Sequence, residues 1–220
     1  MVVRSHPVIV LAGGKSTRLG RDKASELLAG RPLLQHVIDA TSGIASGLIV
    51  VTARGGRLPA VQSRATLLVV EDDFPEAGPL GGVYSGLKAL AGAATGATQA
   101  VLVLACDMPL LQPALLEEVL RVVPGHDAAV PVRDGLPEPL CAAYTTACIE
   151  PARELLEARS YRVSGLLENI DARLILEEHW RLLDPEGLSF LNVNRETDLA
   201  RAKELLSGSP ARPEEDDPSP

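Results

Sequence analysis

The sequence predicts an α/β protein of three layers, in which helices cover both faces of a mostly parallel central sheet. Short apolar runs rich in Val, Leu and Ile alternate along the chain with longer segments of helical pattern. This alternation is typical of parallel strands joined by helical crossovers. The runs are almost continuously apolar, as expected of strands buried on both faces. A length of 220 residues fits one large α/β domain or at most two small ones.

The predicted elements follow one another in this alternating order. Five apolar runs are predicted to be buried strands, and a sixth strand is predicted after a turn at 135–140 that contains Gly and Pro; the six lie at 8–12, 48–52, 67–70, 100–105, 128–132 and 141–144. Helical patterns lie at 32–41, 82–91, 113–122, 153–158 and 197–206. In the third of these helices, Pro113 stands where the first helical turn tolerates proline.

Composition and charge restrict the class of protein. A hydrophobic content of 46% with 23% charged residues predicts a folded globular core. The net charge of −8 argues against a nucleic-acid partner. No apolar run is long enough to span a bilayer, and the first residues lack the apolar core of a signal peptide. We therefore expect a cytoplasmic protein with no membrane partner.

One domain is expected over residues 1–206, because no repeat or shift in composition marks a second. Residues 207–220 are acidic, rich in proline and without an apolar anchor, which predicts a disordered tail. The three cysteines lie on or near apolar segments without C-x-x-C spacing and are expected to be small buried side chains. The four histidines show no zinc-ligand spacing.

A loop directly after the first predicted strand concentrates glycine and positive charge. Gly13 and Gly14 leave the backbone without Cβ atoms, so that it can approach a ligand closely. Four cations lie within the same loop: Lys15, Arg18, Arg21 and Lys23. The backbone amides of such a loop can form a concave anion site. A structural turn is the plain alternative, but four like charges in one loop favour a site for polyphosphate.

Two well-known phosphate motifs do not fit this loop. The P-loop pattern would require a glycine at position 9, where the chain has Ile9. The dinucleotide fingerprint G-x-G-x-x-G is also missing from every window around Gly13 and Gly14. The loop is therefore a phosphate site of another type.

Polar residues follow other predicted strands, where ligands bind in open α/β sheets. Asp107 comes just after the strand at 100–105, and a carboxylate there can hold Mg²⁺ or cap a turn. Asp72 lies in an acidic strand end, and the loop at 78–82 can present a helix N-terminus to an anion or serve only as a connection. Asn194 precedes the last helix, where it can also be an N-cap.

Together these residues resemble the molybdenum cofactor guanylyltransferases. The resemblance runs from Val8 to about Leu206, and its motifs here are Leu11-Ala12-Gly13-Gly14-Lys15-Ser16 with Arg18, Gly20, Asp22 and Lys23, then Gly78-Pro79-Leu80, Cys106-Asp107-Met108-Pro109 and Asn192-Val193-Asn194. The first and third motifs are specific in combination.

The resemblance implies a Rossmann-like nucleotidyltransferase that joins GMP from GTP to the terminal phosphate of molybdopterin and uses Mg²⁺. By similarity Arg18, Lys23 and Asp107 are catalytic, with Asp107 as the metal ligand. It also implies nucleotide contacts by Leu11, Ala12, Gly13, Gly14, Lys23, Thr52, Asp72, Gly78, Pro79, Leu80 and Asp107, and pterin contacts by Asn192 and Asn194. Thr52 stands where the family usually has asparagine, and Arg195 replaces a more usual threonine. Transient contact with molybdopterin-loading proteins or with apo-molybdoenzymes is a further implied partnership.

Two alternative functions remain open at this point. A nucleotidyltransferase of the same fold could use another nucleotide; related cytidylyltransferases typically carry Ala-Gly where this chain has Gly13-Gly14, and we interpret the second glycine as room for guanine. A binding module without catalysis could deliver nucleotide or cofactor to an enzyme. The joint presence of Lys23, Asp72 and Asp107 speaks against the module.

Overall fold

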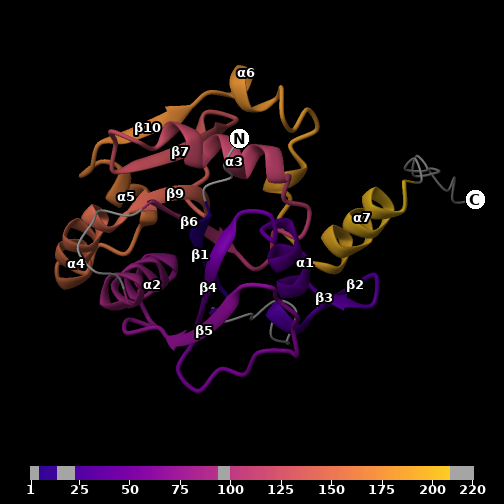
Figure 1. Cartoon of the computed structure of the whole chain (residues 1–220), viewed down its shortest axis with the longest axis horizontal. Coiled ribbons are helices and arrows are strands. Elements are labelled where there is room, and N and C mark those ends of the chain that lie inside the picture. The colour runs from indigo at the N-terminus through magenta and orange to yellow at the C-terminus, as the bar shows by residue number, and fades with distance from the viewer. Residues whose placement is uncertain (1–4, 14–22, 94–99, 209–220) are drawn as a thin grey trace, which may run out of the picture.

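The computed structural model describes residues 5–13, 23–93 and 100–208 of the chain. Its strands are β1 (His6–Leu11), β2 (Leu27–Leu28), β3 (Arg31–Pro32), β4 (Ala45–Thr52), β5 (Thr66–Glu71), β6 (Ala100–Ala105), β7 (Ala128–Arg133), β8 (Leu136–Pro137), β9 (Cys141–Thr145) and β10 (Ala172–Ile175). The central sheet has the order β10-β7-β9-β6-β1-β4-β5, with β8 paired to β7 (Figure 1). Strands β2 and β3 form a separate ribbon.

The sheet is mostly parallel, as predicted. β1 lies inside the sheet and pairs parallel with β4 and with β6, and β4 pairs parallel with β5. The exceptions are β9, which runs antiparallel to both β6 and β7, and the short β8, which runs antiparallel to β7. The neighbouring parallel strands β1, β4, β5 and β6 therefore have their carboxyl ends on the same side of the sheet.

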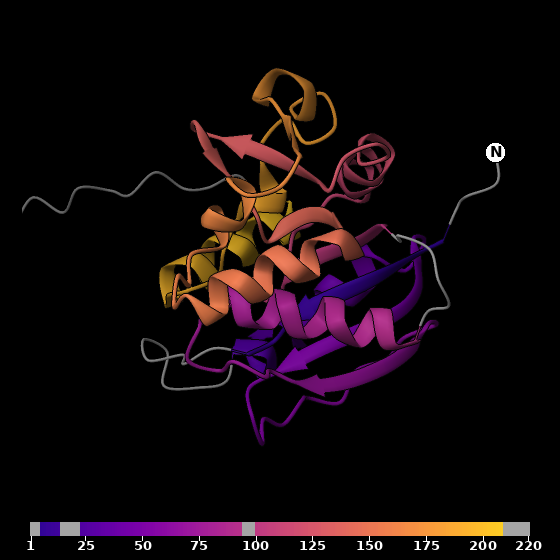
Figure 2. The same ribbon diagram turned by 90° about the vertical axis from the view of Figure 1, so that its left-hand side faces the viewer.

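Helices cover both faces of this sheet. The helices are α1 (Leu33–Ala40), α2 (Pro79–Ala93), α3 (Pro113–Val122), α4 (Ile149–Glu157), α5 (Val163–Leu167), α6 (Glu177–Trp180) and α7 (Glu196–Ser207). The short 3₁₀ segments are η1 (Lys23–Ser25), η2 (Thr146–Cys148) and η3 (Leu188–Phe190). Figure 2 shows α2 and α4 side by side on one face, and α1 and α3 pack on the other. The prediction of three layers is confirmed.

Alternation along β1 explains how one strand serves both layers. Val8 and Val10 belong to the apolar cluster under α1 and α3. Ile9 and Leu11 belong to the cluster under α2 and α4. Successive side chains of a strand point to opposite faces, so a strand buried on both sides must be apolar throughout.

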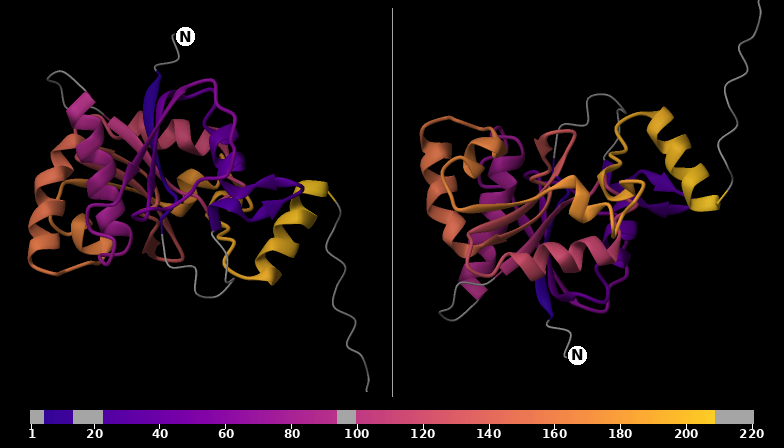
Figure 3. Two further views of the ribbon diagram at one scale, coloured as in Figure 1. Left: turned by 90° about the horizontal axis from the view of Figure 1, so that it is seen from below. Right: turned by 90° about the horizontal axis from the view of Figure 1, so that it is seen from above.

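Helix α7 lies outside the two main layers. Figure 3 places it at one end of the molecule beside the β2–β3 ribbon. A small third apolar cluster joins them, and its buried members are Leu28, Leu33, Leu110, Val193 and Ala202. This packing, together with the hydrogen bond from the Val193 N–H to the Asp107 carbonyl, brings the residues just before α7 to the side of the sheet where the parallel strands end.

The predicted elements differ from the structure in a few places. The run at 67–70 was expected to be a buried strand, and that expectation is wrong: β5 is the edge strand, and Leu68 and Val69 are 46% and 48% exposed. Position in a sheet depends on strand order, which local composition does not encode. Strand β10 and the short helices α5 and α6 were not predicted, because they are too brief for a periodic pattern. All three cysteines are buried, as expected.

Candidate active site

A cleft of about 350 Å³ opens at the edge where the parallel strands end. Residues that directly follow β1, β4, β5 and β6 line it: Ala12, Gly13, Ala53, Asp72, Cys106 and Asp107. The start of α2 contributes Gly78 and Pro79, and Lys23 of η1 forms a further part of the wall. The cleft therefore stands where open α/β sheets bind their ligands.

Gly13 lies close to the chain that leaves β4. A Cβ atom at Gly13 would be 2.9 Å from the backbone nitrogen of Ala53 and 3.2 Å from the carbonyl carbon of Thr52. The preceding residue Ala12 donates its backbone N–H to the carbonyl of Val51 at 2.8 Å. Sequence analysis interpreted this glycine as room for a ligand. Gly13 lines the cleft, and the close approach of two backbones is a second reason for glycine at this position.

Lys23, Asp107 and Asn194 meet at one end of the cleft, although they are far apart in the sequence. The Lys23 ammonium donates to Asp107 Oδ2 at 3.0 Å across a sequence separation of 84 residues. It also donates to the side-chain oxygen of Asn194, 171 residues away. The backbone N–H of Val193 donates to the Asp107 carbonyl at 2.8 Å, which fixes the last of these segments against the first two.

This group of three combines a cation, an anion and an amide at a partly open place. The side chains of Lys23 and Asp107 are 28% and 15% exposed, so both are largely shielded yet reachable from the cleft. A shielded ion pair interacts more strongly with an incoming charge than an exposed pair does. The arrangement is suited to binding phosphate groups through Lys23 and a cation through Asp107.

Asp72 lines the cleft after β5, three strands away from β6 in the sheet, and is 9% exposed. Its Oδ1 accepts the backbone N–H of Phe74 at 2.8 Å and contacts the Ser85 hydroxyl at 3.2 Å. Burial raises the pKa of this carboxyl, while the hydrogen bonds from Phe74 and Ser85 oppose the rise. Its neighbours Glu71 and Asp73 lie elsewhere, since Glu71 accepts from Gly55 and Asp73 pairs with Lys88. Of the acidic strand end, only Asp72 lines the cleft.

The remaining expected nucleotide residues divide into two groups. Leu11, Gly78 and Pro79 line the cleft, and Gly78 has a φ of +62°, which favours glycine. The side chains of Thr52 and Leu80 do not line it. Leu80 is fully buried in the core, and the Thr52 hydroxyl contacts the Val70 carbonyl at 3.4 Å. Gly14 and Arg18 lie outside the described residues.

The structure adds residues that the sequence analysis did not single out. Ser85 holds Asp72 from within α2, and its Oγ also accepts the backbone N–H of Asp73 at 2.9 Å. Glu76 and Leu140 line the cleft. Leu140 reaches it because its carbonyl accepts the backbone N–H of Ala105 at the end of β6. None of these residues stands in a recognisable motif.

Metal binding by protein side chains alone is not supported in the described part of the chain. There, no three His, Cys, Asp or Glu side chains gather closely enough to hold a metal ion. A single carboxylate such as Asp107 can still hold Mg²⁺ when substrate phosphates supply the other ligands. Among the described helices, none has the length and apolar character needed to cross a membrane.

Comparison with known proteins identifies the family. Residues 8–173 match the family model of the MobA-like NTP transferase domain. The chain belongs to this family. The matched residues run from β1 to β10 and so include most of the cleft wall, but they end before Asn192, Asn194 and α7.

Similar sequences in this family cover almost the whole chain. A protein of Methanothermobacter thermautotrophicus, named as a probable molybdenum cofactor guanylyltransferase, is 35% identical over an alignment of 200 residues that covers 87% of this chain and 96% of that protein. A molybdenum cofactor guanylyltransferase of Desulfosudis oleivorans is 28% identical over 200 residues, covering 90% and 94%. The first of these relatives and the family model together confirm the suspected family.

Similar solved structures confirm the nucleotidyltransferase fold. Molybdopterin-guanine dinucleotide biosynthesis protein A from Archaeoglobus fulgidus has a TM-score of 0.74 and 26% identity, covering 92% of this chain and 99% of that one. A 2-C-methyl-D-erythritol 4-phosphate cytidylyltransferase from Thermus thermophilus has a TM-score of 0.65 at 19% identity, with the same coverage, and shows the fold alone.

Proposed function

We propose that this MobA-like protein transfers GMP from GTP to the terminal phosphate of molybdopterin and releases pyrophosphate. The observation that carries the proposal is the meeting of Lys23, Asp107 and Asn194 at the end of a nucleotide-sized cleft. The names of the relatives, which are guanylyltransferases of the molybdenum cofactor, support the choice of substrates.

The cleft divides naturally between the two parts of a nucleotide. Its wall at Gly13, Ala53 and Asp72 offers backbone groups and one carboxylate, which are the kinds of group that bind a base and a ribose. Lys23 and Asp107 pair with each other just after the end of β6. Lys23 supplies the positive charge that binds phosphates, and Asp107 supplies a ligand for their cation. In the proposed complex the polyphosphate therefore lies at Lys23, and the acceptor approaches from Asn194.

The reaction needs no nucleophilic side chain. The attacking phosphate of the acceptor is already an anion at neutral pH, so catalysis rests on alignment and on neutralising charge. Lys23 binds the phosphate oxygens, and Asn194 fixes the direction of the lysine ammonium. The bond that forms joins the acceptor phosphate to the α-phosphorus of GTP. The bond that breaks releases pyrophosphate with its negative charge, which Lys23 stabilises.

Mg²⁺ fits this proposal through Asp107. The carboxylate is mostly shielded and lines the cleft, and one protein carboxylate is a usual contribution to a magnesium site that includes phosphates. When bound, the ion neutralises charge on the phosphate oxygens. In its absence, Lys23 is the direct partner of Asp107.

Replacement of Asp107 tests the proposal. Asp107→Ala is expected to lower pyrophosphate release at least about 100-fold, the scale of losing one group that stabilises transition-state charge. Asp39→Ala serves as the control, because Asp39 pairs with Arg31 at an exposed site on α1. Both variants are expected to keep the circular dichroism spectrum of the parent. Near-normal turnover by Asp107→Ala would contradict the role assigned to this carboxylate.

A comparison of substrates distinguishes the alternatives. Binding of GTP, CTP and ATP in the presence of Mg²⁺ is measured first, and a preference for CTP or ATP would reject the guanylyl assignment. Pyrophosphate release is then compared with and without molybdopterin. Binding of GTP without any release would instead indicate a module that delivers nucleotide or cofactor. Transient contact with molybdopterin-loading proteins or apo-molybdoenzymes belongs to the proposal as the step that follows transfer.

A further inference from the structure

A second pocket of about 390 Å³ has Asn194 in its wall. The side-chain oxygen of Asn194 accepts a hydrogen bond from Lys23, which lines the cleft, so this contact links the pocket to the cleft. An acceptor whose phosphate lies at Asn194, beside the GTP held by Lys23, could therefore extend into the pocket. Three arginines, Arg133, Arg195 and Arg201, line the pocket together with Asp198.

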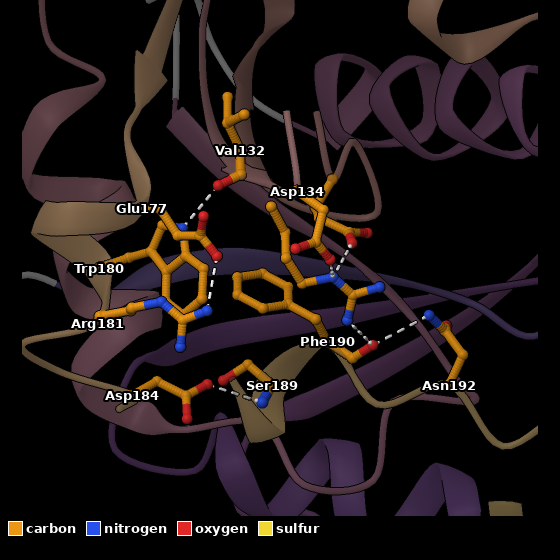
Figure 4. Close-up of polar contacts among 11 residues, drawn as sticks. Val132, Asp134, Glu177, Trp180, Arg181, Asp184, Ser189, Phe190 and Asn192 are labelled. Atoms are coloured by element: carbon orange, nitrogen blue, oxygen red, sulfur yellow. Dashed lines mark hydrogen bonds and ion pairs between the residues drawn. The ribbon is translucent and has the colours of Figure 1, made fainter. Parts of the chain in front are cut away.

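One of these arginines is already committed to the protein. Arg133 donates to the carbonyl of Phe190 at 2.9 Å, and its Nε lies 3.1 Å from Glu138. The side-chain amide of Asn192 donates to the same carbonyl at 3.3 Å (Figure 4). Glu138 balances the charge of Arg133. This arginine is therefore a fixed part of the pocket wall, and it holds the segment that carries Asn192.

The residues around Phe190, next to Arg133, are held by buried contacts. Trp180 donates its indole N–H to the carbonyl of Val132 at 2.8 Å (Figure 4). Its ring packs edge to face against the ring of Phe190, with 4.8 Å between the ring centroids. Asp184 accepts the backbone N–H of Ser189 at 2.8 Å, and both residues are almost fully buried. The pocket is thus preformed on this side, which lowers the entropic cost of binding.

The other two arginines differ from Arg133 in their partners. Arg195 precedes α7 and Arg201 lies within it, on the same side of the helix as Asp198. Within the described ranges, neither guanidinium forms an ion pair with a carboxylate. The Asp198 carboxylate instead accepts the backbone N–H groups of Asn194 and Arg195, both at 2.9 Å. With Arg133 balanced by Glu138, the pocket still has two arginines against one carboxylate, that of Asp198, and this local excess of positive charge in a protein of net charge −8 favours an anionic ligand.

We propose that Arg195 and Arg201 bind an anionic group on the ring system of the pterin acceptor while its terminal phosphate lies at Asn194, next to the GTP phosphates at Lys23. This inference rests on the proposed function. Molybdopterin carries two sulfur atoms that ionise to thiolates on its ring system, in addition to its phosphate. Each guanidinium keeps its positive charge at neutral pH, which suits such an anionic group. The two arginines thereby select an acceptor that carries a second charge besides its phosphate.

Steady-state kinetics with separate variation of the two substrates test the inference. Arg201→Gln is expected to raise the KM for molybdopterin about tenfold, because a lost charge-assisted hydrogen bond is of that order. The KM for GTP is expected to stay within about twofold of the parent, since Arg201 does not line the cleft. Arg201→Lys keeps the charge and is expected to recover most of the affinity. Arg153→Gln is the matched control, as Arg153 pairs with Glu150 and Glu157 on α4.

The outcomes separate this inference from the proposed function. If the parent protein releases no pyrophosphate with GTP and molybdopterin, the proposed function is wrong and the inference falls with it. If the parent is active but Arg201→Gln keeps the parental KM for molybdopterin, the inference alone is wrong. It is also overturned if Arg201→Lys is as weak as Arg201→Gln, because charge would then not be the cause, or if both KM values rise together.

Discussion

Replacement of Gly86 by alanine tests how closely α2 packs on the centre of the sheet. A Cβ atom at this position would lie 2.6 Å from Cγ2 of Ile9 and 3.2 Å from Cγ2 of Val51. Carbon atoms in ordinary contact are about 3.5–4.0 Å apart, so the overlap with Ile9 approaches 1 Å. Ile9 is fully buried in β1, and its branched side chain has few other rotamers to adopt.

The size of the effect follows from two opposing contributions. Overpacking of a dense core costs about 1–3 kcal/mol. Alanine is favoured over glycine inside a helix by about 0.5–1 kcal/mol. We therefore expect Gly86→Ala to lower the free energy of unfolding by about 1–2 kcal/mol. Because β1 and the start of α2 both reach the cleft, weaker GTP binding is expected alongside the loss of stability.

Gly92→Ala in the same helix provides the matched control. No atom lies within 4 Å of the Cβ that it would add, so only the gain in helix propensity remains. In urea unfolding followed by circular dichroism, Gly92→Ala should have the highest midpoint, the parent an intermediate one and Gly86→Ala the lowest. If Gly86→Ala unfolds at the parental midpoint or above it, the close contact between α2 and β1 is wrong.

Three further changes give independent tests. Burial raises the pKa of Asp72 above its ordinary value of 3.8, so its ionisation removes stability from the folded state as the pH rises above that value. Asp72→Asn is therefore expected to be more stable than the parent at neutral pH, to lose this advantage in acid, and to bind GTP more weakly. Urea melts at several pH values measure the stability, and nucleotide titrations measure the binding. An equal gain in stability at all pH values would contradict the role given to the ionisation of Asp72. Asp184→Ala leaves the amides of Leu188 and Ser189 without their buried acceptor and should cost about 2 kcal/mol in the same melts, whereas a change below about 0.5 kcal/mol would be too small for this role. Lys23→Met should lower kcat at least about 100-fold with little loss of stability, and the reasoning fails if only the KM for GTP changes.

Local sequence was sufficient to predict the layers of the fold and the position of the cleft. The near-continuous apolar character of the runs that became β1, β4 and β6 predicted a parallel sheet covered on both sides. Their carboxyl ends lie at one edge in any such sheet, so Gly13, Asp72 and Asp107 could be assigned to one site before their contacts were known. The prediction succeeded because strand direction, once parallel, determines where all the following loops lie.

The same reasoning failed where the surroundings of a residue depend on strand order or on a contact between distant parts of the chain. β5 has the composition of a buried strand yet forms the sheet edge, because its partner on the outer side does not exist among the described residues. The close approach of the backbone that follows β4 is a second reason for glycine at position 13, and it depends on how β1 and β4 lie together in the sheet. Ser85 and Arg201 carry no motif, and only folding brings them to Asp72 and to the second pocket.

By itself the sequence determined the class of fold, the chemistry available at the strand ends and a resemblance that the family match confirms. The tertiary structure alone decided which of those groups meet: Lys23, Asp107 and Asn194 converge, while Thr52 and Leu80 do not line the cleft. The physical reason is separation along the chain. A strand or helix forms from neighbours that are a few residues apart, but a site that joins residues 171 positions apart depends on how the whole sheet is ordered and packed.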